Sequence, residues 1–296
     1  MKYFVDAGED RHLDAAARAG LRGDFLRLTD GITHVELSGP TDGDIIVLTG
    51  GITVPLTYWD DTVLALHRNG FRTLTFSAYG RGHSDRVTAS YDADLFVRQM
   101  SDVIDAVAPG PFHLVGASMG ALVAMEYVRT NSGSAATLAL LGPAGLARRP
   151  VVHRALSAGL VSRPVVRHLG RRIFDHHQGR NVSDPVLAKR LTTMVDDAYR
   201  YEGSLYAFFQ TLQHFPLFDR AELYRATDAA GLPTLLVWGT DDRVTPIDAL
   251  EKVREMLHPD RIHVVEDCGH MVPLERPALV AEQLTTFITS HRSVNP

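Results

Sequence analysis

Short apolar runs alternate with segments of helical periodicity from about residue 34 to the end of the chain. The runs typical of buried strands span residues 45–48, 71–76, 112–115, 137–141, 234–238 and 262–265. Helical segments are predicted between and after them, at residues 57–69, 92–107, 121–128, 248–257 and 279–288. Because strands that alternate with helices build parallel sheets, the pattern predicts an α/β fold, with helices on both faces of a mostly parallel central sheet.

Residues 144–216 depart from this rhythm. They are rich in arginine, histidine and aromatic residues, contain no recognisable strand and are compatible with helices throughout. We predict a helical cap, or lid, inserted between two core strands, so that residues 1–143 and 217–296 form the core. The alternative is that these helices pack on the sheet and gate nothing. The aromatic residues here could line an apolar pocket or pack the cap onto the core: Tyr199, Tyr201, Tyr206, Phe208, Phe209 and Phe215.

Composition narrows the classes of function. The chain has 296 residues, of which 45% are hydrophobic and 22% charged, with a net charge of −5. These proportions suit a globular protein with a substantial core, and no basic field recruits nucleic acid or an anionic membrane surface. The single cysteine, Cys268, excludes an intrachain disulfide and a cysteine metal cluster. We expect a small-molecule substrate as partner, and the composition indicates no oligomeric state.

The chain begins with MKYFVDAGEDRHLD, in which charged residues interrupt any apolar core of the kind that a signal peptide needs. The longest apolar window, residues 110–125, contains Pro111, His113 and Ser118 and does not resemble a membrane span. We therefore expect a cytoplasmic protein. The adjacent histidines at 176 and 177 point apart on a helix or a strand, so we predict no metal site.

The segment Gly116-Ala117-Ser118-Met119-Gly120 fits the pattern G-x-S-x-G between a short buried strand and an apolar helix. This is the context that a nucleophile elbow requires. A sharp strand-to-helix turn holds the serine in a strained conformation and leaves no room for side chains at the two glycines. The Ser118 hydroxyl then projects at the carboxyl edge of the sheet, beside a helix N-terminus that favours negative charge.

A serine hydroxyl needs a base at neutral pH, and the base needs an acid to orient it. His270 follows the last strand and precedes the last helix, in a loop where such a sheet places functional groups. The acid is expected after the preceding strand, where Asp241 and Asp242 compete. Asp242 fits the spacing W-G-x-x-D-x-x-x-P, and Asp241 is interpreted as a solvated or turn-stabilising carboxylate. The order Ser, Asp, His is the one found in α/β-hydrolases.

Acyl transfer also needs two backbone donors for the oxyanion. One is expected from Met119, the residue after the nucleophile. The other is expected from the loop after residues 45–48, where Gly50-Gly51-Ile52 brings backbone close to the site. We choose Ile52 as this second donor.

With these residues in place, the chain resembles the α/β-hydrolase superfamily over roughly residues 30–290, and especially its bacterial esterase- and lipase-like members with a helical cap. Residues 80–85 match the family's G-x-G-x-S loop, and residues 269–277 (GHMVPLERP) resemble its histidine loop. Two positions depart from the family pattern. Gly50 stands where the oxyanion loop usually has histidine, and Ser77 stands where the family usually has aspartate. Both changes indicate a specialised enzyme rather than a generalist lipase.

The chain is therefore predicted to be a serine hydrolase that cleaves an ester, or a related acyl bond, of a small apolar substrate without a cofactor. The same triad could instead hydrolyse a carbon–carbon bond in a diketone, or act as an acyltransferase or thioesterase in a biosynthetic pathway. A ligand-binding protein that keeps the fold without turnover is the alternative of another class. Cys268, next to the base, is interpreted as a small space-filling residue.

Overall fold

The computed structural model describes residues 3–131, 133–151, 170–175, 182 and 184–291. They form one eight-stranded sheet in the order β1-β2-β4-β3-β5-β6-β7-β8. The strands are β1 (Asp24–Arg27), β2 (Ile32–Ser38), β3 (Ile45–Thr49), β4 (Arg72–Phe76), β5 (Phe112–Ala117), β6 (Ala135–Leu141), β7 (Thr234–Gly239) and β8 (Arg261–Val265). The pairs β1–β2 and β2–β4 are antiparallel. All other neighbouring strands in the sheet, from β4 to β8, are parallel. The predicted α/β-hydrolase fold is confirmed.

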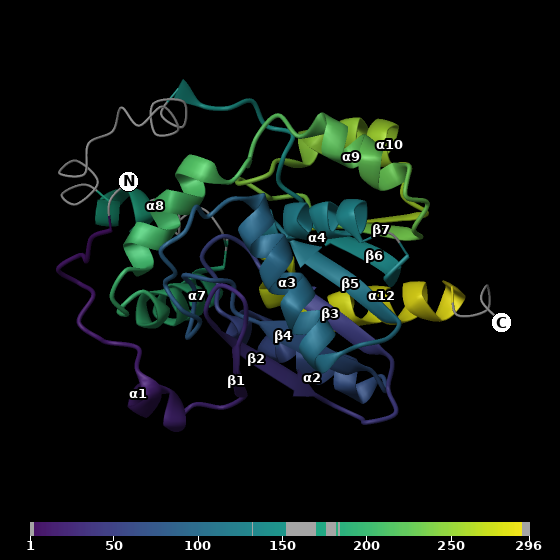
Figure 1. The fold of residues 1–296 in the computed structure, drawn as a ribbon. Helices are drawn as coiled ribbons and strands as arrows, with labels where there is room; N and C mark the ends of the chain where they lie inside the picture. Colours follow the sequence, from purple (N-terminus) through teal and green to yellow (C-terminus); the bar gives the residue numbers. More distant parts are fainter. Residues whose placement is uncertain (1–2, 132, 152–169, 176–181, 183, 292–296) are drawn as a thin grey trace.

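Helices cover both faces of this sheet (Figure 1). Their bounds are α1 (Ala15–Ala19), η1 (Leu56–Trp59), α2 (Asp60–Arg68), α3 (Ala93–Val107), α4 (Met119–Thr130), α7 (Pro185–Ala198), α8 (Ser204–His214), α9 (Ala221–Asp228), η2 (Ile247–Ala249), α10 (Leu250–Leu257), α11 (Val272–Glu275) and α12 (Pro277–His291). On one face α2 packs against α12, and on the other α3, α4, α9 and α10 pack in series. Every residue of β5 and β7 is buried, as in strands covered on both sides.

All six predicted strands are present, with ends shifted by at most two residues. The hairpin β1–β2 and the helices α1, α9 and α11 were not predicted. The hairpin was not recognised because β2 has the sequence ITHVELS, in which buried Thr33 and His34 interrupt the apolar pattern. Their polar groups are paired from distant segments: Gln99 Nε2 donates to the Thr33 hydroxyl at 2.9 Å, and the His34 N–H donates to Ser84 Oγ at 2.9 Å. A single sequence does not reveal such long-range partners.

The chain leaves the sheet after β6 and returns to it at β7. Within residues 144–216, the described part contains α7, α8 and a helical stretch at 170–175, and no strand. The N-terminal segment lies beside α8 (Figure 1), and Glu9 accepts the N–H groups of Gly203 at 3.0 Å and Leu205 at 2.6 Å. The helical character of this insertion agrees with the predicted cap, and the division into core and cap stays a prediction.

The aromatic residues of the insertion pack against the core and against one another. None of the six is more than 6% exposed. The ring of Phe215 lies 5.7 Å from that of Phe96 in α3, and Tyr206 lies 6.4 Å from Tyr91, measured between ring centroids. Of the two interpretations of these aromatic residues, this arrangement favours packing of the insertion onto the core.

Candidate active site

Ser118 lies at a sharp turn between β5, which ends at Ala117, and α4, which begins at Met119. Its backbone has φ 56° and ψ −117°, in the region that L-residues rarely adopt. The glycines on both sides are required by close contacts. A Cβ at Gly116 would lie 2.5 Å from the carbonyl oxygen of Gly120, and a Cβ at Gly120 would lie 2.4 Å from that of Thr49. The turn therefore presents the Ser118 side chain at the N-terminus of a buried helix, as the motif predicted.

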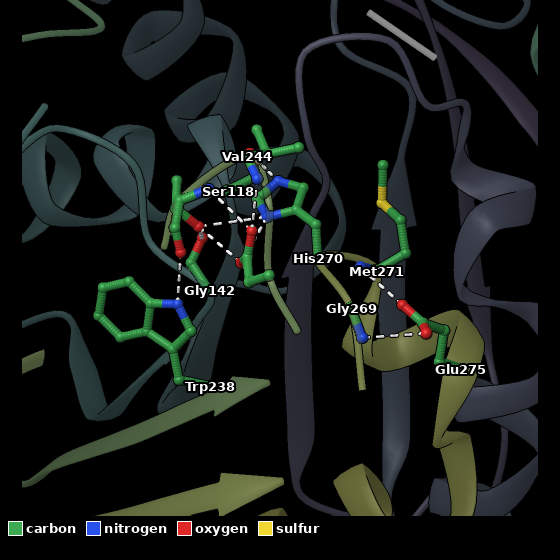
Figure 2. A network of polar contacts seen from close by, with 10 residues as sticks. Ser118, Gly142, Trp238, Val244, Gly269, His270, Met271 and Glu275 are labelled. Carbon is green, nitrogen blue, oxygen red and sulfur yellow. Dashed lines mark hydrogen bonds and ion pairs between the residues drawn. The ribbon is translucent and has the colours of Figure 1, made fainter. Parts of the chain in front are cut away.

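His270 lies in the loop after β8 and Asp242 in the loop after β7, and both meet at Ser118. Figure 2 shows His270 beside Ser118. Ser118 Oγ lies 2.8 Å from His270 Nε2, and His270 Nδ1 lies 2.8 Å from Asp242 Oδ2. Because a carboxylate only accepts hydrogen bonds, the proton of the neutral imidazole is on Nδ1, and Nε2 is free to accept the serine proton. The structure thus brings the three predicted residues into one hydrogen-bonded chain.

The Asp242 carboxylate is buried and saturated with donors. Its Oδ1 accepts the backbone N–H groups of Val244 at 2.8 Å and Thr245 at 2.7 Å. Its Oδ2 accepts the Thr245 hydroxyl at 2.7 Å as well as His270 Nδ1–H. Burial alone would raise the pKa of this carboxyl group, but the bonds and charge of His270 and the bonds from Thr245 outweigh it, so the pKa is lowered. Asp242 is held ionised beside the imidazole.

Thr245 was not singled out from the sequence. Its hydroxyl also lies 3.2 Å from His270 Nδ1, and its carbonyl accepts the indole N–H of Trp238 at 2.7 Å. Both residues belong to the WGTDDRVTP segment that supplied Asp242, so the motif contained the signal. Asp241, the competing carboxylate, is exposed and accepts the neighbouring Thr240 hydroxyl at 3.3 Å. This placement matches its interpretation as a solvated residue.

Glu275 supports the histidine loop from both sides. Its carboxylate accepts the backbone N–H of Gly269 at 3.0 Å and that of Met271 at 3.2 Å, the two residues that flank His270 (Figure 2). The side chain is buried in α11, and burial raises its pKa while these two N–H groups oppose the rise. Glu275 lies inside the GHMVPLERP segment, but its contact with the loop could not be assigned from the sequence alone.

Met119 and the loop that precedes Ile52 lie beside the nucleophile. Met119 is the first residue of α4, and the N–H groups of a helix's first turn have no partner within the helix. The loop after β3 runs against Ser118: a Cβ at Gly51 would lie 3.5 Å from Ser118 Cβ and 3.8 Å from its Oγ. Ile52 follows directly and is only 7% exposed. The carboxyl ends of β3 and β5 therefore bring the loop that contains Ile52 beside Ser118, and the choice of Met119 and Ile52 as donors stays a prediction.

The alpha/beta hydrolase family profile matches residues 45–283, which is most of the chain. The chain belongs to the alpha/beta hydrolase family. It is similar to the 2-hydroxy-6-oxo-6-(2'-aminophenyl)hexa-2,4-dienoic acid hydrolase of Metapseudomonas resinovorans, with 25% identity over 80% of each chain. It is also similar to a monoacylglycerol lipase of Mus musculus, with 26% identity over 71% of this chain and 66% of the other. A thermophilic esterase from Thermogutta terrifontis has a similar structure, with a TM-score of 0.75, 20% identity, and coverage of 92% of this chain and 99% of that one.

The residues at the two departures from the family pattern make defined local contacts in this alpha/beta hydrolase. A Cβ at Gly50 would lie 2.8 Å from Val54 Cγ2, so a larger residue would require Val54 to move. Ser77 is fully buried, and its hydroxyl oxygen accepts the backbone N–H of Leu56 at 3.1 Å. The neutral Ser77 hydroxyl thus forms a hydrogen bond with Leu56, in the segment that follows the loop after β3.

Cys268, the single cysteine of this hydrolase, is buried. Burial raises the pKa of the Cys268 thiol to about 12, which agrees with a packing role for that side chain. Among the described residues, no group of three or more histidine, cysteine, aspartate or glutamate side chains is arranged to hold a metal ion. The histidine pair at 176 and 177 lies outside the described residues. No helix in the described part of the chain is long and apolar enough to cross a membrane.

Proposed function

We propose that this alpha/beta hydrolase is a serine hydrolase that cleaves an ester or related acyl bond of a small, largely apolar substrate through an acyl-enzyme. The observation that carries the proposal is the continuous chain from Ser118 Oγ through His270 to Asp242, with both links at 2.8 Å. Nucleophile, base and orienting acid are in reach of one another without any rearrangement.

The reaction follows from this geometry in two steps. Ser118 Oγ attacks the substrate carbonyl carbon while its proton passes to His270 Nε2. The N–H groups of Met119 and Ile52 donate hydrogen bonds to the carbonyl oxygen as it becomes negatively charged. His270 returns the proton to the leaving group, which departs and leaves the acyl group on Ser118. Water then gives a proton to His270 Nε2 and attacks the acyl carbon. The bond between the acyl carbon and Ser118 Oγ breaks, His270 returns the proton to Oγ, and the acid is released. Asp242 stabilises the imidazolium in both steps.

Hydrolysis of a carbon–carbon bond is the second candidate. It is favoured by the similarity to the dienoic acid hydrolase of Metapseudomonas resinovorans. A hydroxy-oxo-hexadienoic acid contains no ester linkage, so its hydrolysis must break a carbon–carbon bond beside a carbonyl group. The same serine, base and oxyanion donors would act, and the leaving group protonated by His270 would be carbon instead of oxygen.

We further propose that residues 144–216 form a cap over the site. Support comes from the helical character of the described part, which is inserted between β6 and β7. β6 is followed by Gly142, whose carbonyl oxygen lies 3.2 Å from the Thr245 hydroxyl oxygen. The insertion thus begins beside the proposed triad, which suits a segment that controls access to it.

The test of the proposed function is labelling with a fluorophosphonate, followed by substrate turnover. Wild type should be labelled stoichiometrically, Ser118→Ala not at all, and His270→Ala slowly; Asp241→Asn should behave like wild type. Esters, a vinylogous diketone, and esters with an added alcohol acceptor then separate ester hydrolysis, carbon–carbon hydrolysis and acyl transfer. Wild type that stays unlabelled beside a reactive control esterase would refute the proposal. Labelling without turnover, together with ligand-induced thermal stabilisation, would favour a binding protein.

A further inference from the structure

Arg81 is an unusual residue for the interior of this fold. It lies between Gly80 and Gly82 in the loop after β4 and is fully buried. Both glycines have positive φ, 81° and 49°, and a Cβ at Gly80 would lie 2.3 Å from Ala207 Cβ in α8. The tight turn therefore places Arg81 directly against the cap helix α8.

The guanidinium of Arg81 joins three separate segments. Its Nε donates to the carbonyl of Ile52 at 2.8 Å, and Nη1 donates to the carbonyl of Tyr79 at 2.8 Å. Its Nη2 donates to the hydroxyl of Thr211 in α8 at 2.7 Å, and that hydroxyl in turn donates to the carbonyl of Ala207 at 2.9 Å. The oxyanion loop, the loop after β4 and the cap are connected through one side chain.

This cation is buried at a cost. No ion pair links Arg81 to a carboxylate within the part of the chain that the structure describes. Instead the guanidinium lies 5.4 Å from the ring centroid of Phe96 and 5.9 Å from that of Tyr91. Burial of a charge without an opposite charge is unfavourable for folding. We therefore look for the role of Arg81 in the groups that it holds in place, and not in the free energy of folding.

What it holds is the residue expected to donate to the oxyanion. The peptide carbonyl and the N–H of Ile52 are separated by only two rotatable backbone bonds, so a fixed carbonyl restricts the direction of the N–H. The loop itself has little intrinsic rigidity, because Gly50 and Gly51 precede Ile52 and the side chain usual at position 50 is missing. A hydrogen bond from outside the loop supplies the missing restraint.

We propose that Arg81 is a positioning residue that holds Ile52 in place for oxyanion binding and couples this loop to the cap through Thr211. The inference rests on the proposed function, because it assigns the purpose of the Ile52 N–H. Arg81 does not touch the reacting atoms, and its effect is on the geometry of a donor.

The chain offers a matched control in Arg86. This arginine comes from the same loop and also reaches the cap, with Nη2 donating to the carbonyl of Ala198 at 2.9 Å and Nε donating to Ser204 Oγ at 3.0 Å. Its Nη1 donates to the carbonyls of Gly82 and Ser84, and none of its hydrogen bonds within the described residues reaches Ile52. Replacement of Arg86 should remove the bonds to Ala198 and Ser204 while leaving the Arg81–Thr211 contact, and with it the oxyanion loop, in place.

The experiment compares Arg81→Met, Arg81→Lys and Arg86→Met in the full chain. Kinetics are measured with an ester that wild type hydrolyses, and hydrogen exchange of peptides covering residues 50–55 is followed by mass spectrometry. We expect Arg81→Met to lower kcat about 10- to 100-fold, somewhat less than complete loss of an oxyanion donor, with KM changed by less than about threefold. Exchange in the loop should accelerate. Arg81→Lys should recover part of both properties, and Arg86→Met should lower thermal stability with kcat within about twofold of wild type.

The activity measurements test the proposed function, and the exchange measurements test the role of Arg81 separately. If wild type neither reacts with fluorophosphonate nor hydrolyses esters, the proposed function fails, and loop exchange still decides whether Arg81 positions Ile52. If Arg81→Met exchanges at residues 50–55 like wild type, or loses no more kcat than Arg86→Met, the role of Arg81 is refuted. Should Arg81→Met fail to fold, Arg81→Lys and Thr211→Val decide instead: unchanged kcat and unchanged loop exchange in both would refute the role.

Discussion

Replacement of Asp242 with asparagine tests the assignment of the acid most directly. In the structure Oδ1 accepts two backbone N–H groups, from Val244 and Thr245, and Oδ2 accepts the Thr245 hydroxyl and His270 Nδ1–H. An asparagine has one acceptor oxygen, and the two backbone donors select it for the Oδ1 position. Its amide nitrogen then occupies the Oδ2 position and faces His270 Nδ1 as a donor.

A donor at that position reverses the tautomer of the His270 imidazole. Nδ1 must then accept, so the proton moves to Nε2, and Nε2 can no longer take the proton of Ser118 2.8 Å away. In serine proteases this change lowers kcat about 10⁴-fold. A factor of that size corresponds to about 5.4 kcal/mol in the activation free energy. We expect a loss of the same order here, with little change in KM, because the side chain keeps its shape.

The measurement is kcat for an ester that wild type hydrolyses, with the rate of fluorophosphonate labelling as a second readout. Asp241→Asn is the matched control, since Asp241 is adjacent, exposed and remote from the imidazole contacts. If Asp242→Asn retains more than about a tenth of wild-type kcat, or if Asp241→Asn loses as much activity, the reasoning from tautomer to rate is refuted.

Three further predictions concern the surroundings of the site. Thr245→Val removes a hydroxyl that donates to the buried Asp242 carboxylate, so the free energy of unfolding should fall by about 1.5–3 kcal/mol; a urea titration without any loss would contradict this. Glu275→Gln leaves one acceptor oxygen for the two N–H groups that flank His270, and kcat should fall about 10-fold or more through misplacement of the base. An unchanged kcat would mean that the loop keeps its shape unaided. Burial lowers the pKa of His83 from 6.5 to about 4. Between these two pH values His83 is protonated in the unfolded chain and neutral in the folded chain, so the free energy of unfolding falls as the pH drops from 6.5 to 4. His83→Phe should flatten that fall in thermal melts between pH 7 and 4, and an unaltered slope would exclude the mechanism.

Much of the fold could be predicted because parallel strands buried on both faces appear in a sequence as continuous apolar runs. β3, β5 and β7 are of this kind, and their ends were found within two residues. The antiparallel hairpin β1–β2 is different, since its buried polar residues are paired only through contacts with distant segments. Helix boundaries were similarly uncertain: the predicted helix at 57–69 is divided into η1 and α2, where the chain tightens around Trp59.

The three proposed catalytic residues could be located from their order and their positions after strands, because the topology of the sheet brings those loops together. The supporting residues could not. Glu275 acts over a few residues and lies in a motif already noted, so its spacing from Gly269 and Met271 is a usable signal in retrospect. Arg81, in contrast, contacts Ile52 across 29 positions and Thr211 across 130. No local pattern in a single sequence encodes such pairings.

The replacements at positions 50 and 77 are connected once these contacts are considered together. The segment from Ile52 to Leu56 is bonded at both ends by the region after β4. Arg81 donates to the Ile52 carbonyl, and Ser77 accepts the Leu56 N–H. An oxyanion loop supported from outside needs no large side chain of its own, and Gly50 leaves the space that Val54 occupies. Since Arg81 also reaches α8, this support depends on how the cap is docked, whereas a histidine within the loop would act independently of the cap. The geometry of the oxyanion site in this hydrolase is therefore linked to cap position through Arg81.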